Sequence, residues 1–445
     1  MEEVANLLYS NIYLQALAVL TPIISFVLWI YSKAKNKTHA DGLVIESKDE
    51  FLWFQKEVIA KKRTLLSALA HSLNFDLLEA SHFRKPSPSF PLLMHSDWLP
   101  TKPISLDKID IETIEYQSPK VFPPNSLLPL KDKETTYPTF HDAIYELMKP
   151  RIFKSNPQYR IMGFQPNSDR YTIQISREAD EYFSKIDFGK PMEYELAKSV
   201  ISNKERFKNH FTIKDYVKWS SNNYRKKAVK ALAKTPHSFH DIVVLGGIST
   251  LTLIYNEEEK DFRFLMHERS TKQGYASGIK HVIPAGDYQP LNKSDRFEMD
   301  LPLWHNIMRE MAEELANKPE YEEKEGKRID YQSTEPFKSY SNAPTNGDLK
   351  IYFAGFGLDP LSLQGEILTI MVVREHTFHA LFGKEPLEKN EEGFLISSDG
   401  KWGLPFTEKE VTNMQNMAVL AAGHTLLSVA IQQKPFLLSE MASSK

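Results

Sequence analysis

The chain has 445 residues, no cysteine and a formal net charge of −3 at pH 7. Without cysteine it can form no disulfide, thiolate zinc site or cysteine nucleophile, so carboxylates and histidines must hold any metal, which favours Mg²⁺ or Mn²⁺. The nearly balanced charge excludes a protein whose whole surface binds duplex nucleic acid, and the length predicts two domains.

The first predicted element is a single membrane-spanning helix over residues 12–31. This segment contains no charged residue, and about 20 apolar residues suffice to cross the hydrocarbon layer of a bilayer. Acidic residues precede the segment and lysines follow it: Glu2, Glu3, then Lys33, Lys35 and Lys37. The positive-inside rule therefore places residues 1–11 outside and everything after the linker 32–41 in the cytoplasm. A cleaved signal peptide would instead begin with basic residues.

Residues 42–235 form a predicted α+β region of unassigned fold. Leucines at helical spacing predict helix within 51–78, and the pattern of 194–201 is also helical. Alternating apolar residues predict a strand at 171–176. Many prolines between 83 and 138 exclude long helices and central strands from that segment.

After Pro236 the pattern changes to short strands interrupted by helices. The predicted strands cover residues 249–255, 262–268, 281–286, 349–358 and 368–374, and the predicted helices cover 303–316 and 408–433. The glycine pair at 246–247 is interpreted as a turn. Alternating strands and helices predict an α/β sandwich, with helices packed against a mixed sheet, over residues 236–445.

The segment 309–315, REMAEEL, contains the strongest chemical signal in the chain. Residues three and four apart share a helix face, so Glu310, Glu313 and Glu314 converge. Like charges placed this way repel, and a bound divalent cation would turn that repulsion into coordination. We expect Arg309 to pair with a carboxylate and hold its orientation. Three glutamates also occur on plain solvated helix faces, so the spacing alone leaves both interpretations open.

This segment resembles the core of the Nudix signature, GX5EX7REUXEEXGU, where U is a bulky aliphatic residue. The matched residues are Arg309, Glu310, Met311, Glu313 and Glu314. Upstream, a strand ending in Pro284-Ala285-Gly286 resembles the start of the signature, with Gly286 as its first glycine. The resemblance covers about 241–433 and implies a Nudix-like α/β/α sandwich. It also implies that the three glutamates bind Mg²⁺ or Mn²⁺, that one of them is the base, that Arg309 orients them, and that Gly286 belongs to the ligand-binding loop.

The loop of the signature is altered in this chain. It is about nine residues longer than in the family pattern. Asn292 and Leu301 stand where glutamates are expected, although Glu298 lies within the loop, and Ala316 replaces the second glycine. The resemblance therefore implies a Nudix fold in which hydrolysis is either retained or replaced by binding alone.

The remaining candidates are weaker. They are the histidines His267, His281, His305, His376 and His379, and a basic cluster of Arg225, Lys226, Lys227, Lys230 and Lys234. His376 and His379, three residues apart, could share a site, although most such histidines are surface or satisfied core residues. The basic cluster is interpreted as a solvated helix face, with anionic lipid or nucleotide binding as the alternative.

A transmembrane segment followed by a Nudix domain resembles effectors of the bacterial cyclic-oligonucleotide antiphage systems (CBASS). That resemblance implies a homo-oligomer in the inner membrane that senses a cyclic oligonucleotide or other nucleotide and then damages the lipid bilayer, causing abortive infection. The alternative is a membrane-tethered, Mg²⁺-dependent pyrophosphohydrolase of nucleoside-diphosphate derivatives. A membrane-anchored scaffold without a ligand is a third interpretation.

Overall fold

The computed structural model describes residues 39–85, 87–150, 153–167, 169–202, 223–269, 279–291, 297–319, 329–386 and 393–442. The predicted transmembrane segment 12–31 lies outside these ranges. Among the described residues, no helix is both long enough and apolar enough to span a bilayer.

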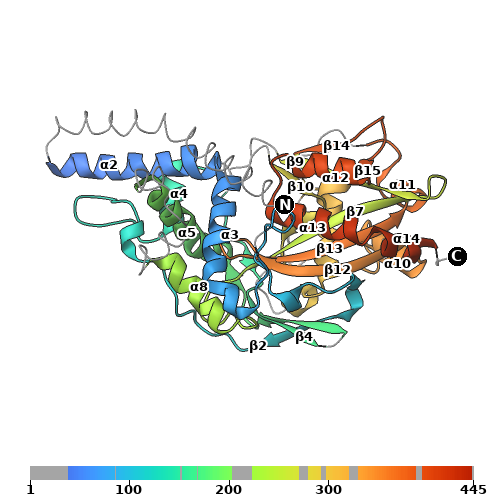
Figure 1. Cartoon of the computed structure of the whole chain (residues 1–445), viewed down its shortest axis with the longest axis horizontal. Helices are drawn as coiled ribbons and strands as arrows, with labels where there is room; N and C mark the ends of the chain where they lie inside the picture. The colour runs from blue at the N-terminus through green and yellow to red at the C-terminus, as the bar shows by residue number, and fades with distance from the viewer. Residues whose placement is uncertain are drawn as a thin grey trace.

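A mixed seven-stranded sheet is the centre of the described part of the chain (Figure 1). Its order is β1 (Ile104–Ser105), β12 (Leu349–Leu358), β13 (Gly365–Arg374), β7 (Gly246–Asn256), β8 (Asp261–Phe264) and β15 (Leu404–Pro405), with β11 (Ala285–Asp287) beside β7. Strands β7 and β13 run parallel, and the other neighbours run antiparallel. Every residue of β7 is buried, as expected for a central strand covered on both faces.

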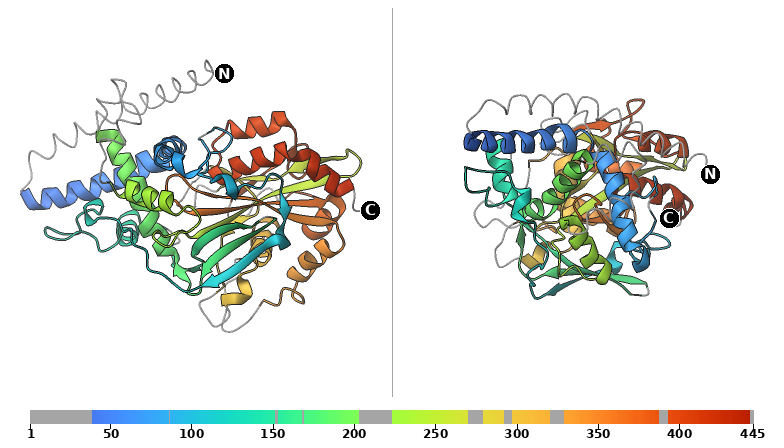
Figure 2. Two further views of the ribbon diagram at one scale, coloured as in Figure 1. Left: turned by 60° about the horizontal axis from the view of Figure 1, so that its bottom comes forward. Right: turned by 60° about the vertical axis from the view of Figure 1, so that its left-hand side comes forward.

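Helices cover both faces of this sheet (Figure 2). One face carries α12 (Glu408–Gln415), α13 (Ala421–Gln432) and α14 (Lys434–Ala442), and the other carries α9 (Leu303–Glu310), its π-helical continuation η7 (Met311–Leu315) and α10 (Phe337–Thr345). Helix α11 (Glu375–Phe382) follows β13 directly. Leu427 of α13 packs in one core with Leu251, and Ile307 of α9 packs in the other with Ile248. The predicted α/β sandwich with a mixed sheet is confirmed.

Two local predictions after Pro236 are wrong. The predicted helix 408–433 is two helices, α12 and α13, with a break between them. The glycine pair Gly246–Gly247 begins strand β7 and forms no turn. Neighbours approach these glycines closely: a Cβ on Gly247 would lie 3.2 Å from an oxygen of Glu366, and one on Gly246 would lie 3.2 Å from Cβ of Tyr288.

The region before β7 forms a helical group, at the left of Figure 1, and several short strands. The helices are α2 (His39–Trp53), η1 (Phe54–Ala60), α3 (Arg63–Leu78), α4 (Phe140–Met148), α5 (Tyr182–Ser202) and α8 (Tyr224–Lys234). Strand β2 (Ile109–Ile114) is at the edge of a small sheet, beside β5 (Arg170–Ser176) and then β4 (Ile161–Asn167). The described part of the proline-rich segment thus contains no long helix and no central strand, as predicted.

Three smaller strand groups complete the described architecture. Strand β9 (Met266–Arg269) lies between β10 (Lys280–Val282) and β14 (Gly393–Ile396), and β3 (Pro157–Gln158) pairs with β6 (Asp180–Glu181). Strand β1 comes from the proline-rich segment and pairs with β12 of the main sheet. The largest core also combines residues from before and after Pro236, and the domain boundary there remains a prediction.

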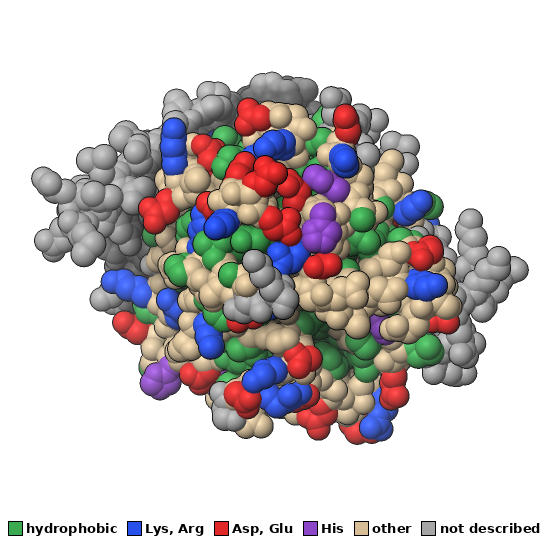
Figure 3. Space-filling view, turned by 90° about the vertical axis from the view of Figure 1, so that its right-hand side faces the viewer, with side chains coloured by type: hydrophobic (Ala, Val, Ile, Leu, Met, Phe, Trp, Pro, Cys, Tyr) green, Lys and Arg blue, Asp and Glu red, His purple; other side chains and the backbone are tan. Residues whose placement is uncertain are grey.

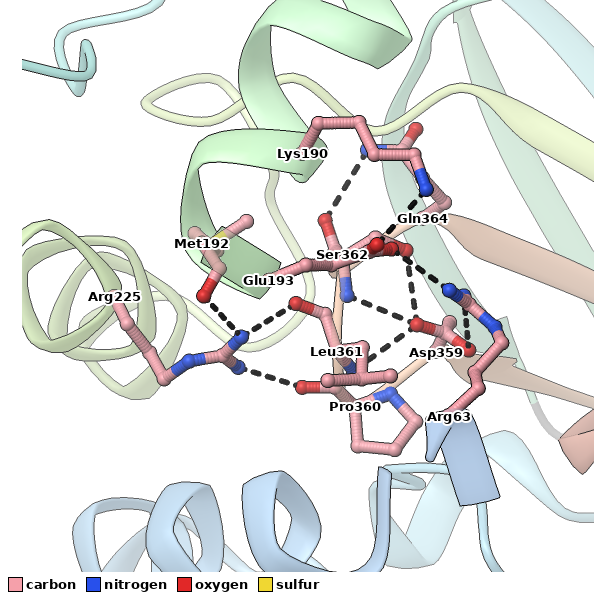
Figure 4. Close-up of polar contacts among 10 residues, drawn as sticks. All are labelled: Arg63, Lys190, Met192, Glu193, Arg225, Asp359, Pro360, Leu361, Ser362 and Gln364. Carbon is pink, nitrogen blue, oxygen red and sulfur yellow. Dashed lines mark hydrogen bonds and ion pairs between the residues drawn. The ribbon is translucent and has the colours of Figure 1, made fainter. Parts of the chain in front are cut away.

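The helical group holds the turn between β12 and β13 through buried polar contacts (Figure 4). Arg225 of α8 donates to the carbonyl oxygens of Pro360 at 2.7 Å, Leu361 at 2.6 Å and Met192 at 3.0 Å. A guanidinium group has five N–H donors in a rigid planar fork, which suits several fixed acceptors at once. The first residue of the predicted basic cluster is therefore buried and structural, whereas Lys227, Lys230 and Lys234 form an exposed face as predicted.

A buried ion cluster lies beside this contact (Figure 4). Glu193 of α5, with a side chain 1% exposed, accepts from Arg63 of α3 at 3.1 Å and from Lys190 at 2.8 Å. In the same turn, the carboxylate oxygen Oδ2 of Asp359 lies 3.9 Å from Arg63 Nη2. Burial opposes ionisation of Glu193, but the two cations and their hydrogen bonds outweigh burial and lower its pKa to about 2.

Candidate functional site

The predicted site helix forms over residues 303–315 as α9 and η7. Ile307, Met311 and Leu315 are buried and form the predicted apolar edge of the helix. Glu310 and Glu313 are half-buried, and Glu314 is buried. The carboxylates thus project from the last turns of the helix, where its hydrogen bonding changes from α to π. Such π-helical turns often occur at functional sites.

Gly286 and Glu310, predicted to share a site, are in contact. A Cβ atom added to Gly286 would lie 2.1 Å from Oε1 of Glu310 and 2.2 Å from its Cδ. The carboxylate therefore occupies the space that any larger residue would need at position 286. This contact joins the end of the strand to the helix.

We expect Gly286→Ala to displace the Glu310 carboxylate with little loss of stability, because a flexible side chain can move aside. Cation affinity at the helix should fall by roughly 10- to 100-fold, the range seen when the support of a metal ligand is removed. Titration with Mn²⁺ checks this prediction. The double variant Gly286→Ala/Glu310→Ala should bind no more weakly than Glu310→Ala alone, and additive losses would contradict the contact.

Glu314 is fixed by the backbone of the same strand. Its Oε2 accepts a hydrogen bond from the Ala285 N–H at 2.8 Å, and its Oε1 lies 4.0 Å from Nδ1 of His267. Since Ala285 and Gly286 are consecutive, Glu314 and Glu310 are both brought to one short stretch of β11. Glu313, on the same helical turn, is half-buried.

Arg309 holds the enlarged loop. It is buried and donates to Asp300 Oδ1 at 3.1 Å, to the Tyr331 hydroxyl at 2.8 Å and to the Gln289 carbonyl at 2.5 Å. The expected pairing with a carboxylate is present, but the partner belongs to the loop, because consecutive helix residues do not face each other. Its role in orienting Glu310 remains a prediction.

The structure describes three of the positions at which this chain departs from the signature, Glu298, Leu301 and Ala316. Glu298 is exposed in η6 (Phe297–Asp300), and Leu301 is buried. Ala316 directly follows η7. Asn292 lies outside the described residues.

A second group of polar residues follows the same strands on the opposite face of the sheet. Glu366, Gly247 and Asp287 are in register across β13, β7 and β11. Successive strand residues point to opposite faces, so Asp287 and Gly286 face opposite ways. Lys185 of α5 donates to Asp287 Oδ1 at 2.6 Å, which brings a cation from the helical group to this edge of the sheet.

Glu366 is the functional candidate that the sequence reasoning missed. The Ser249 hydroxyl donates to its Oε2 at 3.1 Å, and His281 Nε2 lies 3.2 Å from that same hydroxyl. Burial raises the pKa of Glu366 to about 7, although the nearby Lys185 favours the charged form. Glu366 is half-buried, and a carboxyl with a raised pKa often marks a functional site. The available signal was an acidic residue at the start of the otherwise apolar strand EILTIMVV.

The raised pKa of Glu366 predicts a pH-dependent stability. The folded protein binds this proton more tightly than the unfolded chain, so the contribution to stability is lost as pH rises from about 4.5 to about 7. We therefore expect Glu366→Gln to unfold at a higher temperature than the parent at about pH 8, by roughly 2 °C or more, and to match it at about pH 4. Thermal unfolding at both pH values checks this. The exposed Glu258→Gln is the control, and an equal shift in that variant would contradict the assignment.

The other predicted histidines have structural surroundings. His305 stacks on Tyr331 with ring centroids 3.9 Å apart, and its Nδ1 lies 2.9 Å from the Met299 carbonyl. His376 is exposed beside Glu257 and Asp348. Among the described residues, His376 and His379 belong to no group that could share a metal ion.

On the face shown in Figure 3, charged side chains of both signs are interspersed.

No protein-family model and no curated protein matches this chain. Among solved structures, a NUDIX hydrolase from Alicyclobacillus acidocaldarius is similar over 44% of this chain and 96% of that chain, with 15% identity and a TM-score of 0.27. At that TM-score the likeness carries no argument.

Proposed function

We propose that the protein is a membrane-anchored, Nudix-type nucleotide-binding protein whose glutamates Glu310, Glu313 and Glu314 hold Mg²⁺ or Mn²⁺ against the phosphates of its ligand. The observation that carries this proposal is the contact between the Glu310 carboxylate and the Gly286 backbone. This contact brings the end of the strand, at Gly286, against the helix that carries Glu310, and the signature includes both residues.

The donor set fits a hard cation. Carboxylate oxygens are preferred ligands of Mg²⁺, which usually keeps several water molecules and takes only one or two carboxylates from the protein. Glu314 is held in place by the Ala285 N–H, and Glu310 is held against Gly286. When bound, such a cation neutralises phosphate charge and lowers the pKa of bound water.

The protein's own residues would position the ligand. Arg309 ties Asp300 and Gln289, at the two ends of the enlarged loop, to the helix that carries the carboxylates. Glu313 shares the turn of Glu314 without the same depth of burial, which leaves it accessible to act as the base. These roles are common to a hydrolase and to a receptor that binds its ligand without turnover.

Of these two, the receptor fits the whole chain better, and we assign it to the CBASS effectors, acting at the bacterial inner membrane as a homo-oligomer. Helix α2 begins at His39, shortly after the predicted transmembrane segment, and leads to α3, whose Arg63 meets the buried cluster at the β12–β13 turn. That turn leads directly into Glu366. A cyclic oligonucleotide that binds one arrangement of this junction more tightly would increase the population of that arrangement. The transmembrane segment would then act on the bilayer.

One experiment separates the receptor from the membrane-tethered pyrophosphohydrolase. The full-length protein is reconstituted in liposomes and incubated with Mg²⁺ and either ADP-ribose, a dinucleoside polyphosphate or a cyclic dinucleotide, and binding, product release and dye leakage are measured together. Saturable binding of the cyclic dinucleotide with leakage and without turnover supports the receptor. Turnover of a linear compound without leakage supports the hydrolase. Absence of binding for every compound contradicts both.

A further inference from the structure

A second group of cation-binding side chains lies far from the helix glutamates, on the proline-rich segment. His95 and Asp97 flank the start of the short helix η3 (Ser96–Trp98), and His237 comes from the segment that leads to β7. Trp98 of the same turn is fully buried, with its ring against Phe83, Phe164, Phe239 and Phe356. The backbone at His95 and Asp97 is therefore fixed by the core beneath it.

The three side chains converge with the spacing of metal ligands. Asp97 Oδ2 lies 3.6 Å from His95 Nδ1 and 3.7 Å from His237 Nε2, and the two imidazole rings are 4.6 Å apart. Ligands about 2.0–2.2 Å from a tetrahedral Zn²⁺ are separated by roughly 3.4 Å. Small side-chain adjustments therefore suffice to place one cation among the three atoms. Among the described residues, this is the group of three histidine and carboxylate side chains whose ligand atoms all lie within 4.8 Å of one another.

Backbone contacts orient both imidazoles toward Asp97. The Nδ1 of His237 lies 3.2 Å from the Phe164 carbonyl, which leaves Nε2 toward the carboxylate. His95 Nδ1 accepts from the Asp97 N–H at 3.2 Å and lies 3.6 Å from the Asp97 carboxylate. A histidine that binds a metal through one nitrogen commonly donates its other N–H to a backbone carbonyl in this way.

Two contacts compete with a cation. The Asp97 N–H points at His95 Nδ1 from 3.2 Å, and the Trp98 Nε1–H points at His237 Nδ1 from 3.4 Å. Both are long for hydrogen bonds, so their loss costs little. The Phe164 carbonyl is the nearer partner of His237 Nδ1, and a cation on Nε2 selects the tautomer that donates to it.

We propose that His95, Asp97 and His237 bind one divalent transition-metal ion, such as Zn²⁺, and that solvent supplies the fourth ligand. Imidazole suits Zn²⁺ and its neighbours, whereas Mg²⁺ prefers oxygen ligands, so this site and the helix glutamates select different cations. Asp97 is 52% exposed, which gives the ion and its water access from solvent. The ion would fasten the proline-rich segment to the chain beside β4 and β7.

Cobalt titration of the metal-stripped, full-length protein in detergent tests the proposal. One equivalent of Co²⁺ should produce the visible absorption of a tetrahedral site, and Zn²⁺ should abolish it. His237→Ala and Asp97→Asn should each weaken Co²⁺ binding by more than about 100-fold, beyond the effect of removing a supporting contact. Glu314→Gln, at the helix glutamates, should leave the spectrum unchanged.

The exposed Asp97 keeps the test decisive if His237→Ala fails to fold, because Asp97→Asn changes one surface atom. Zn²⁺ should also raise the unfolding temperature of the parent and of Glu314→Gln, but not of Asp97→Asn. Absence of a tetrahedral spectrum in the parent, or a spectrum that survives both Asp97→Asn and His237→Ala, would overturn the proposal.

Discussion

Replacing Glu314 by glutamine is expected to lower the cation-dependent affinity for ligand, and the rate of any turnover, by at least about 100-fold. The carboxylate is buried and fixed by the Ala285 N–H through Oε2, so its position does not depend on a bound ion. Glutamine can keep that hydrogen bond through its amide oxygen but supplies no negative charge. Isothermal titration with nucleotide in the presence and absence of Mg²⁺ measures the loss.

Glu298→Gln is the matched control for this variant, because Glu298 is an exposed glutamate in the enlarged loop close to the helix in sequence. It should bind cation and ligand like the parent. Retention of Mg²⁺-dependent binding by Glu314→Gln, or an equal loss in Glu298→Gln, would contradict the assignment of the helix glutamates as cation ligands.

Removing Glu193 is expected to destabilise the protein by roughly 3–5 kcal/mol, the usual cost of breaking a buried ion pair from one side. Arg63 and Lys190 would remain, with side chains only 8% and 15% exposed, and without their shared acceptor. Denaturant unfolding of Glu193→Ala measures the change. Lys61→Ala, which breaks the exposed pair between Lys61 and Glu57, should alter stability by no more than about 1 kcal/mol.

The same cluster predicts sensitivity to acid. The pKa of Glu193 is lowered to about 2 in the folded protein, so its stabilising contribution is fully present above the ordinary value of 4.5 and is lost as pH falls from there towards 2. The stability difference between the parent and Glu193→Ala should therefore shrink over that range. A difference that stays constant down to about pH 2 would show that packing, not charge, is responsible.

The local pattern of the sequence was sufficient to predict most of the sandwich. The strand Leu349–Leu358 has the predicted bounds, and the apolar edge of Ile307, Met311 and Leu315 is buried. Hydrophobic periodicity depends on near neighbours in the chain, so it is readable without the fold. The glycine pair 246–247 was misread because its role depends on Tyr288 and Glu366, which are distant in sequence.

The candidate site was predictable only in part, for the same physical reason. Glu310, Glu313 and Glu314 share a helix face by spacing alone, and Gly286 was found through its place before that helix. Glu366 could not be found, because its raised pKa arises from burial and from the nearby carboxylates of Asp359 and Asp287, which outweigh the opposing effects of Lys185 and Ser249. The position of Arg309 before Glu310 likewise did not reveal that its carboxylate partner is Asp300 of the enlarged loop.

On our proposal, the helix glutamates, supported by Gly286, form a cation site for a phosphate-bearing ligand. Electron paramagnetic resonance of Mn²⁺ bound to the full-length protein tests it most directly. The claim predicts a bound ion whose spectrum changes on addition of nucleotide, and whose affinity falls in both Glu314→Gln and Gly286→Ala. Mn²⁺ binding that is absent in the parent, or unaffected by both substitutions, would contradict it.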